Sequence, residues 1–164
     1  MEIETAARRQ MLTVDVIKGY VQSKVFKFSL LEHVQGTSGR ALVIRRSNGW
    51  ASPDPVQSSE YPLLVFDCWA DPTRDSMGGV AADDAVDKAY ALYRAVNAQV
   101  HGIRDVWWGA GGANPGLRII SAARWGEPFH MTASDQHGSG PKLMGTPLQD
   151  CAVVTVQYAI HTAH

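Results

Sequence analysis

The sequence predicts a single α+β domain in which two long helices pack on a four-stranded mixed or antiparallel sheet. Its 164 residues match the commonest size of one domain and are enough to bury a hydrophobic core. Hydrophobic residues make up 45% of the chain and charged residues only 19%, which excludes a chain that is disordered throughout. Apolar residues also recur with helical or strand-like spacing, in the order helix, strand, strand, helix, strand, strand.

The first half of the chain predicts one helix and two strands. Apolar residues at steps of three and four place a helix over residues 5–24. Residues 41–46 form a short predicted strand, which the turn signal at residues 47–49 ends. The next predicted strand, residues 61–69, is apolar on both faces and therefore belongs inside the sheet. Proline cannot donate to a neighbouring strand, so Pro62 is expected at its start.

The second half predicts a helix, two strands and a long connection. Asp83 or Asp84 suits the N-cap of a helix that ends near residue 101. Residues 117–125 and 151–161 form the last two predicted strands, and the second alternates apolar and polar residues almost without fault. About two dozen residues separate these strands, whereas compact domains typically use about two to six. We therefore interpret residues 126–150 as an extended interaction loop.

Charge and composition exclude several classes of protein. A net charge of −1 speaks against a chain whose main task is tight binding of nucleic acid, because such proteins carry a basic excess. Acidic residues at positions 2 and 4 replace the basic start of a secretory signal, and the longest apolar run, residues 63–66, is too short to span a bilayer. We expect a soluble protein of a reducing compartment, with no membrane partner.

The residues that could carry catalysis form no recognisable site. The glycine-rich segment 109–116 follows a helix and precedes a strand, the reverse of a phosphate-binding turn, so a flexible turn is expected. The histidines lack the spacing of a zinc hydrolase, and His130 and His137 are the strongest of a weak set. Cys68 and Cys151 lie among apolar residues without the spacing of a metal or dithiol site, which predicts buried free thiols and no cofactor.

Asp67, Trp107 and Trp108 need a specific explanation. Asp67 interrupts an apolar strand, so it either faces solvent or pairs with an arginine of a neighbouring subunit. Trp107 and Trp108 are adjacent, and in an extended segment they cannot both enter one core. Either a loop folds over the outer tryptophan or a second subunit covers it.

The middle of the chain resembles a family of phage proteins. The segment YPLLVFDCWAD at residues 61–71, followed by the alanine-rich helix at residues 81–101, is similar to the tail terminator proteins of long-tailed bacteriophages that infect actinobacteria. In those proteins an N-terminal helix precedes a strand that ends in a Cys-Trp-Ala-like tripeptide. An alanine-rich helix and two strands separated by a variable loop follow. The order of elements covers most of the chain, and residues 67–70 are the most specific part.

The resemblance implies a structural protein without an active site or cofactor. Its members form a six-membered ring that caps the tail tube, stops addition of the major tail tube protein and offers a surface to the head–tail connector. DNA passes through the lumen without specific binding, which agrees with the low net charge. The implied location is the tail–neck junction of the virion, after assembly in the cytoplasm of the bacterial host.

The long loop is the part that departs from the shortest family members. We expect it to reach a neighbouring subunit or the tube, with Phe129, Met131 and Leu143 as apolar anchors beside His130. Two alternatives remain open at this point. One is another neck protein, such as a tail completion or head closure protein. The other is a small enzyme that pairs Cys68 or Cys151 with a loop histidine.

Overall fold

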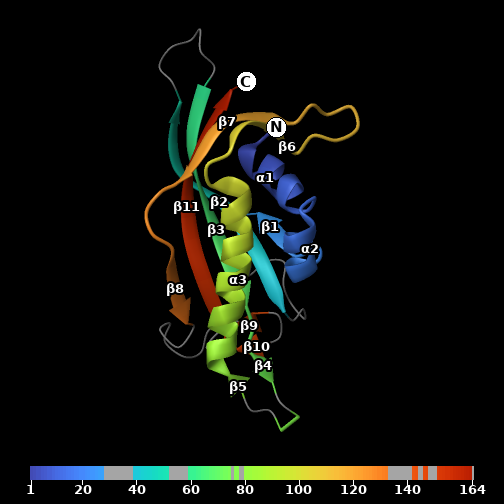
Figure 1. The fold of residues 1–164 in the computed structure, drawn as a ribbon, viewed down its shortest axis with the longest axis vertical. Coiled ribbons are helices and arrows are strands. Elements are labelled where there is room, and N and C mark those ends of the chain that lie inside the picture. The colour runs from blue at the N-terminus through green and yellow to red at the C-terminus, as the bar shows by residue number, and fades with distance from the viewer. Residues whose placement is uncertain are drawn as a thin grey trace.

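A computed structural model describes residues 1–27, 39–51, 59–74, 76–77, 80–132, 142–143, 146–147 and 151–163. Within these residues, seven strands form one mixed sheet (Figure 1). The strands are β1 Val25–Lys27, β2 Arg40–Ala51, β3 Ser59–Ala70, β6 Arg104–Trp108, β7 Leu117–Arg124, β8 Phe129–Thr132 and β11 Ala152–Ala163. Their order is β1-β2-β3-β11-β7-β6, and β8 pairs with the part of β11 that β7 leaves free.

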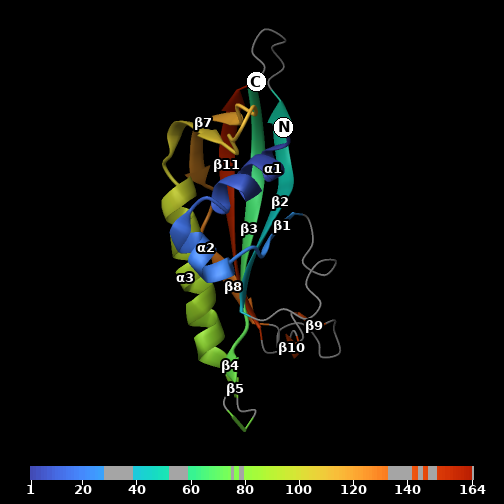
Figure 2. The same ribbon diagram turned by 90° about the vertical axis from the view of Figure 1, so that its right-hand side faces the viewer.

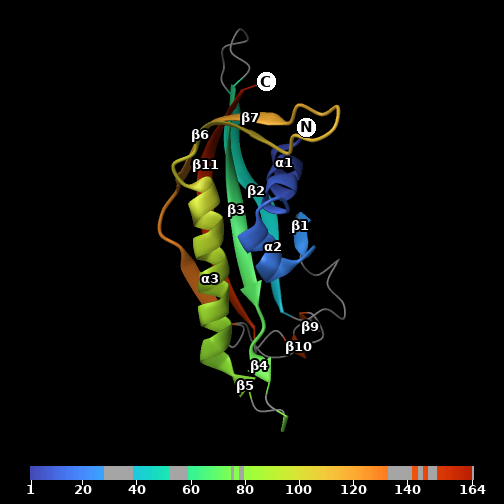
Figure 3. The same cartoon turned by 45° about the vertical axis from the view of Figure 1, so that its right-hand side comes forward.

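The described helices all pack on one face of this sheet. They are α1 Ile3–Met11, α2 Asp15–Val21 and α3 Ala82–Val100. Figure 2 shows the sheet edge-on with the helices on one side, and α3 runs along β3 and β11. At the end that carries the N-terminus, β6 and β7 curl across α1 (Figure 3).

The predicted architecture of four strands and two long helices is wrong. The sheet is larger, and the predicted helix over residues 5–24 is two short helices. The hydroxyl of Thr13 donates to the carbonyl of Gln10 at 2.7 Å, in the break between them. Such a side-chain bond competes with helical backbone bonds. The break still lets α1 bury Met11 and α2 bury Ile17, which is why one apolar stripe appeared continuous.

The unpredicted strands are short or irregular. β1 has three residues, pairs in parallel with β2, and begins at Val25, at the end of the stripe that predicted a helix. β6 contains Asp105 with a positive φ of 49°. β8 occupies part of the predicted loop 126–150, so that loop is shorter than expected. The predicted turn at residues 47–49 is an irregularity within β2, where its register with β3 shifts.

Two small hairpins complete the described structure. β4 Thr73–Arg74 pairs with β5 Val80–Ala81, and β9 Lys142–Leu143 pairs with β10 Thr146–Pro147. The first hairpin leads into α3 at the end of the molecule opposite the N-terminus (Figure 1). Asp83 or Asp84 was predicted as the N-cap of this helix, but α3 begins at Ala82, before both residues. The Asp84 carboxylate accepts hydrogen bonds from the backbone N–H and hydroxyl of Thr73 and pairs with Lys88.

The main core lies between the helices and the sheet. It contains alternate residues of the central strands, such as Phe66 and Tyr158, whose rings meet edge to face at 5.5 Å. The Tyr158 hydroxyl donates to the side chain of Asn97 on α3 at 2.9 Å, which satisfies it inside the core. A smaller apolar cluster of Ala41, Val43 and Cys151 lies on the other face of the sheet.

Candidate assembly surfaces

Asp67 lies on β3, on the sheet face opposite the helices. Its residue is only 8% exposed. Arg45 Nε on β2 donates to Asp67 Oδ2 at 2.8 Å, and the Thr155 hydroxyl on β11 donates to Oδ1 at 2.7 Å. The bond to Asp67 raises the pKa of the half-exposed Arg45 guanidinium. The arginine expected from a neighbouring subunit is therefore supplied by the same chain, and this ion pair ties the three central strands together.

An apolar strip runs beside this ion pair on the same face. Opposite residues in paired strands share a face, and the register pairs Trp69 with Val153 and Thr155 with Phe129. Trp69 is half-buried, Val153 is buried and the Phe129 side chain is 50% exposed. The backbone of Met131 pairs with Val153, while its side chain falls outside the described residues. Partly exposed aromatic side chains such as Trp69 and Phe129 are enriched in protein interfaces.

The two adjacent tryptophans of β6 face opposite ways. Trp108 is 2% exposed and packs in the main core, whereas Trp107 is 52% exposed. Trp125, just after β7, is also exposed. The described residues cover about half of Trp107, and its role at an interface stays a prediction.

The other residues proposed for the long loop differ in their surroundings. His130 is exposed, and its Nδ1 lies 3.3 Å from the Tyr90 hydroxyl on α3. Leu143 belongs to β9, but its side chain is outside the described part of the chain. Of residues 133–150, the structure describes only β9 and β10. The role of this segment as an interaction loop therefore stays a prediction.

The two cysteines are buried in different apolar clusters of the structure. Cys68 is fully buried in the main core, and desolvation raises its pKa, which disfavours the reactive thiolate. Cys151 is buried in the smaller cluster. Among the described residues, no group of three or more His, Cys, Asp or Glu could hold a metal ion. His137 lies outside the described residues.

The glycine-rich segment 109–116 is the connection of the β6–β7 hairpin. A Cβ at Gly116 would lie 2.5 Å from the carbonyl oxygen of Trp108, and φ is +84°, so this turn requires glycine. Two antiparallel strands flank the segment, and no helix begins there to bind a phosphate. Of the helices in the described ranges, none is both long and apolar enough to cross a membrane.

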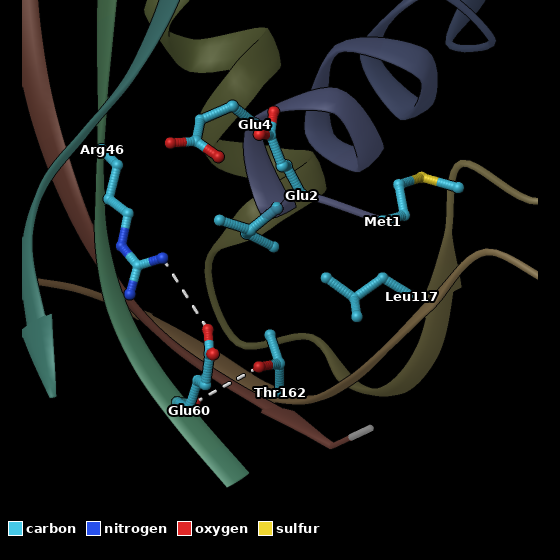
Figure 4. Close-up of a pocket in the computed structure, with 8 residues that line it drawn as sticks. Met1, Glu2, Glu4, Arg46, Glu60, Leu117 and Thr162 are labelled. Carbon is cyan, nitrogen blue, oxygen red and sulfur yellow. Dashed lines mark hydrogen bonds and ion pairs between the residues drawn. The ribbon is translucent and has the colours of Figure 1, made fainter. Parts of the chain in front are cut away.

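A pocket of about 420 Å³ opens where α1 meets the ends of the sheet (Figure 4). Three carboxylates and one guanidinium line it, those of Glu2, Glu4, Glu60 and Arg46. Arg46 Nη1 lies 3.7 Å from Glu60 Oε2, and Glu2 pairs with Lys27 at 3.4 Å. The remaining wall is formed by Met1, Ile3, Leu117 and Thr162.

The sequence did not predict this pocket, although Glu4 carries part of its signal. Glu4 precedes Ala7 and Met11 by three and seven positions, so it lies on the buried face of α1 with them. A carboxylate on a buried helical face is unusual enough to mark a site. The contribution of Arg46 and Glu60 could not be foreseen, because it depends on how α1 lies against β2 and β3.

Among known proteins, a similarity of fold is found with a solved structure but no similarity of sequence to a family. No family model matches the sequence, and no curated protein matches it either. Among solved structures, a chain from the "Virion of native gene transfer agent (GTA) particle" has the same fold, with a TM-score of 0.57 and 15% sequence identity. The match covers 98% of this chain and 94% of that chain. The chain therefore has the fold of a virion protein over nearly its whole length.

Proposed function

We propose that this chain is a structural protein of a tailed bacteriophage or a phage-like particle. The observation that carries the proposal is the fold shared with a virion chain across 98% of this protein. Burial of Cys68 in the core agrees with a structural role, since it leaves this thiol unsuited to catalysis. The function is expected to reside in surfaces that meet other copies and other virion proteins.

Within that class, we propose a tail terminator. The resemblance of residues 61–71 and 81–101 to that family is the specific support. A six-membered ring of this chain would cap the tail tube at its final length, stop addition of the major tail tube protein and present a surface to the head–tail connector. Trp107 and Phe129, each about half exposed, supply apolar area for such contacts, and the Arg45–Asp67 pair lies beside Phe129 on the same sheet face.

The test is tube assembly with the major tail tube protein from the same genome. Tubes polymerised with this chain should stop growing and carry a ring at one end in electron micrographs, while tubes without it should keep lengthening. A Trp107→Ala, Phe129→Ala double variant should fold normally and leave the tubes uncapped. If the chain binds the connector proteins but never a tube, another neck protein is the correct assignment. Binding to neither would contradict the whole proposal.

A further inference from the structure

The acidic pocket contains one carboxylate, that of Glu4, that forms no ion pair with a described residue. Glu4 is only 6% exposed, and no hydrogen bond or ion pair joins its side chain to another described residue. Figure 4 shows its carboxylate extending from α1 into the pocket, toward the strand that carries Arg46. Burying an unpaired carboxylate is costly, so proteins normally provide such a group with a partner.

The other charges of the pocket already have partners. Glu60 lies against Arg46 and Glu2 against Lys27, so Glu4 is the one carboxylate of the lining that has no ion pair within the described residues. The pocket therefore favours a cation. The described residues bring no metal-binding group together here or elsewhere, so an organic cation fits better than a metal ion.

The walls suit a long basic side chain. Ile3 and Leu117 are buried apolar residues of the lining, and they offer a surface for an aliphatic stem whose charged end meets Glu4. Arginine and lysine have this construction. A guanidinium or ammonium placed here would form a charge-assisted hydrogen bond in a partly desolvated site.

We propose that this pocket receives an arginine or lysine side chain from a second copy of the chain. The inference rests on the proposed ring, in which different patches of neighbouring subunits meet. Charge complementarity supports a second copy as the source. Four exposed basic residues have no ion-pair or hydrogen-bond partner among the described residues, and they are Arg9, Lys18, Arg94 and Arg104. The described structure thus contains a buried carboxylate without an ion-pair partner and exposed basic side chains without an ion-pair partner.

The first experiment tests the ligand chemistry without requiring a ring. N-acetyl-argininamide, which carries only the guanidinium charge, is titrated into the protein while the methyl signals of Ile3 and Leu117 are followed by NMR. We expect saturable shifts at these methyls and none with the neutral N-acetyl-citrullinamide. Glu4→Gln should weaken binding by at least about tenfold, as expected for a lost charged partner. Asp87→Asn, which removes the same charge at an exposed site on α3, should leave it unchanged.

The absence of local shifts, or equal shifts with both compounds, would overturn the pocket as a cation site. The unfolding of the isolated subunit provides a further check. Because Glu4 has no described partner, Glu4→Gln should not lower the stability of the monomer. A clear loss of monomer stability would mean that Glu4 acts within its own subunit.

The second experiment tests the source of the cation. Rings of wild type, Glu4→Gln and Asp87→Asn are diluted and their dissociation is followed by native mass spectrometry. Glu4→Gln should raise the concentration of half-dissociation by at least about tenfold. Glu4→Arg should prevent assembly, and combining it with Glu at the true donor, one of Arg9, Lys18, Arg94 or Arg104, should restore it.

The two experiments separate this inference from the proposed function. If argininamide binds but Glu4→Gln rings are as stable as wild type, or no charge exchange restores assembly, a second copy is not the occupant. If wild type never forms a ring, even with the tube protein, the proposed function and the second-copy occupant both fail. The argininamide titration would then still decide what kind of ligand the pocket binds.

Discussion

Trp107 and Trp108 are neighbours on β6, yet Trp108 is 2% exposed in the main core and Trp107 is 52% exposed on the surface. Successive residues of a strand point to opposite faces, so only one of the two can join the core under α1. The sequence predicted this division without indicating which tryptophan is outside. The exposed indole is a large apolar surface at the edge strand of the sheet.

Truncating the two tryptophans should have opposite effects on folding and assembly. Trp108→Ala is expected to lower the free energy of unfolding by about 3–5 kcal/mol, because it leaves a cavity in the core. Trp107→Ala should change it by no more than about 0.5 kcal/mol but weaken ring or tube binding. Urea unfolding and a pull-down with tube protein measure the two effects. Equal destabilisation by both substitutions would contradict the division.

Removing Asp67 should destabilise the sheet. Asp67→Ala leaves the buried Thr155 hydroxyl and the Arg45 guanidinium without their acceptor, at an expected cost of about 1–3 kcal/mol in the free energy of unfolding. Glu127→Ala is the control at an exposed ion pair. It removes the carboxylate that pairs with Arg124 and is far more exposed than Asp67, so its cost should be much smaller. If both variants lower the free energy of unfolding in urea by a similar amount, the burial of the Asp67 carboxylate adds nothing to the strength of its bonds.

The attachment of β4 to α3 should weaken in acid. Hydrogen bonds from Lys88 and Thr73 lower the pKa of Asp84 to about 2, below the value of about 3.9 expected in the unfolded chain. The ionised carboxylate therefore stabilises the folded state above about pH 4, and this contribution is lost as the pH falls from about 4 toward 2. Carboxyl NMR should show this low titration midpoint. Asp84→Asn should remove that part of the pH dependence of stability, and Asp87→Asn should retain it.

Both cysteines should react slowly in the folded protein. Cys68 is buried with a raised pKa, and Cys151 is buried on the other face of the sheet. Alkylation with iodoacetamide at neutral pH should therefore be much slower in the native protein than in urea, where both thiols are exposed. Rapid labelling of either cysteine under native conditions would instead favour the thiol enzyme considered from the sequence.

The sequence located several elements because their burial leaves a local pattern. The predicted strand 61–69 lies within β3, a central strand whose side chains are largely buried on both faces of the sheet. The predicted helix from Asp83 or Asp84 corresponds to α3, whose apolar stripe faces one core. In each case the spacing of apolar residues reflects the surface that the element buries.

The spacing of apolar residues did not predict the short elements. β1 and β8 contain three and four residues, fewer than a periodic pattern needs to be recognised. The gap between α1 and α2 was hidden because both helices bury residues on the same side of the sheet. The predicted count of four strands was wrong because β1, β6 and β8 were all missed, and β6 has only five residues, of which Asp105 has a positive φ.

The sequence by itself determined where β3, β7, β11 and α3 lie, that Cys68 is in an apolar environment, and that only one of two adjacent tryptophans enters the core. The tertiary structure alone decided which strands pair, that Arg45 of the same chain satisfies Asp67, and that Glu4 reaches a pocket with Arg46 and Glu60. The physical reason is the range of the interactions. Periodic burial is recorded in neighbouring residues, whereas strand pairing and charge pairing join residues that are far apart in the chain.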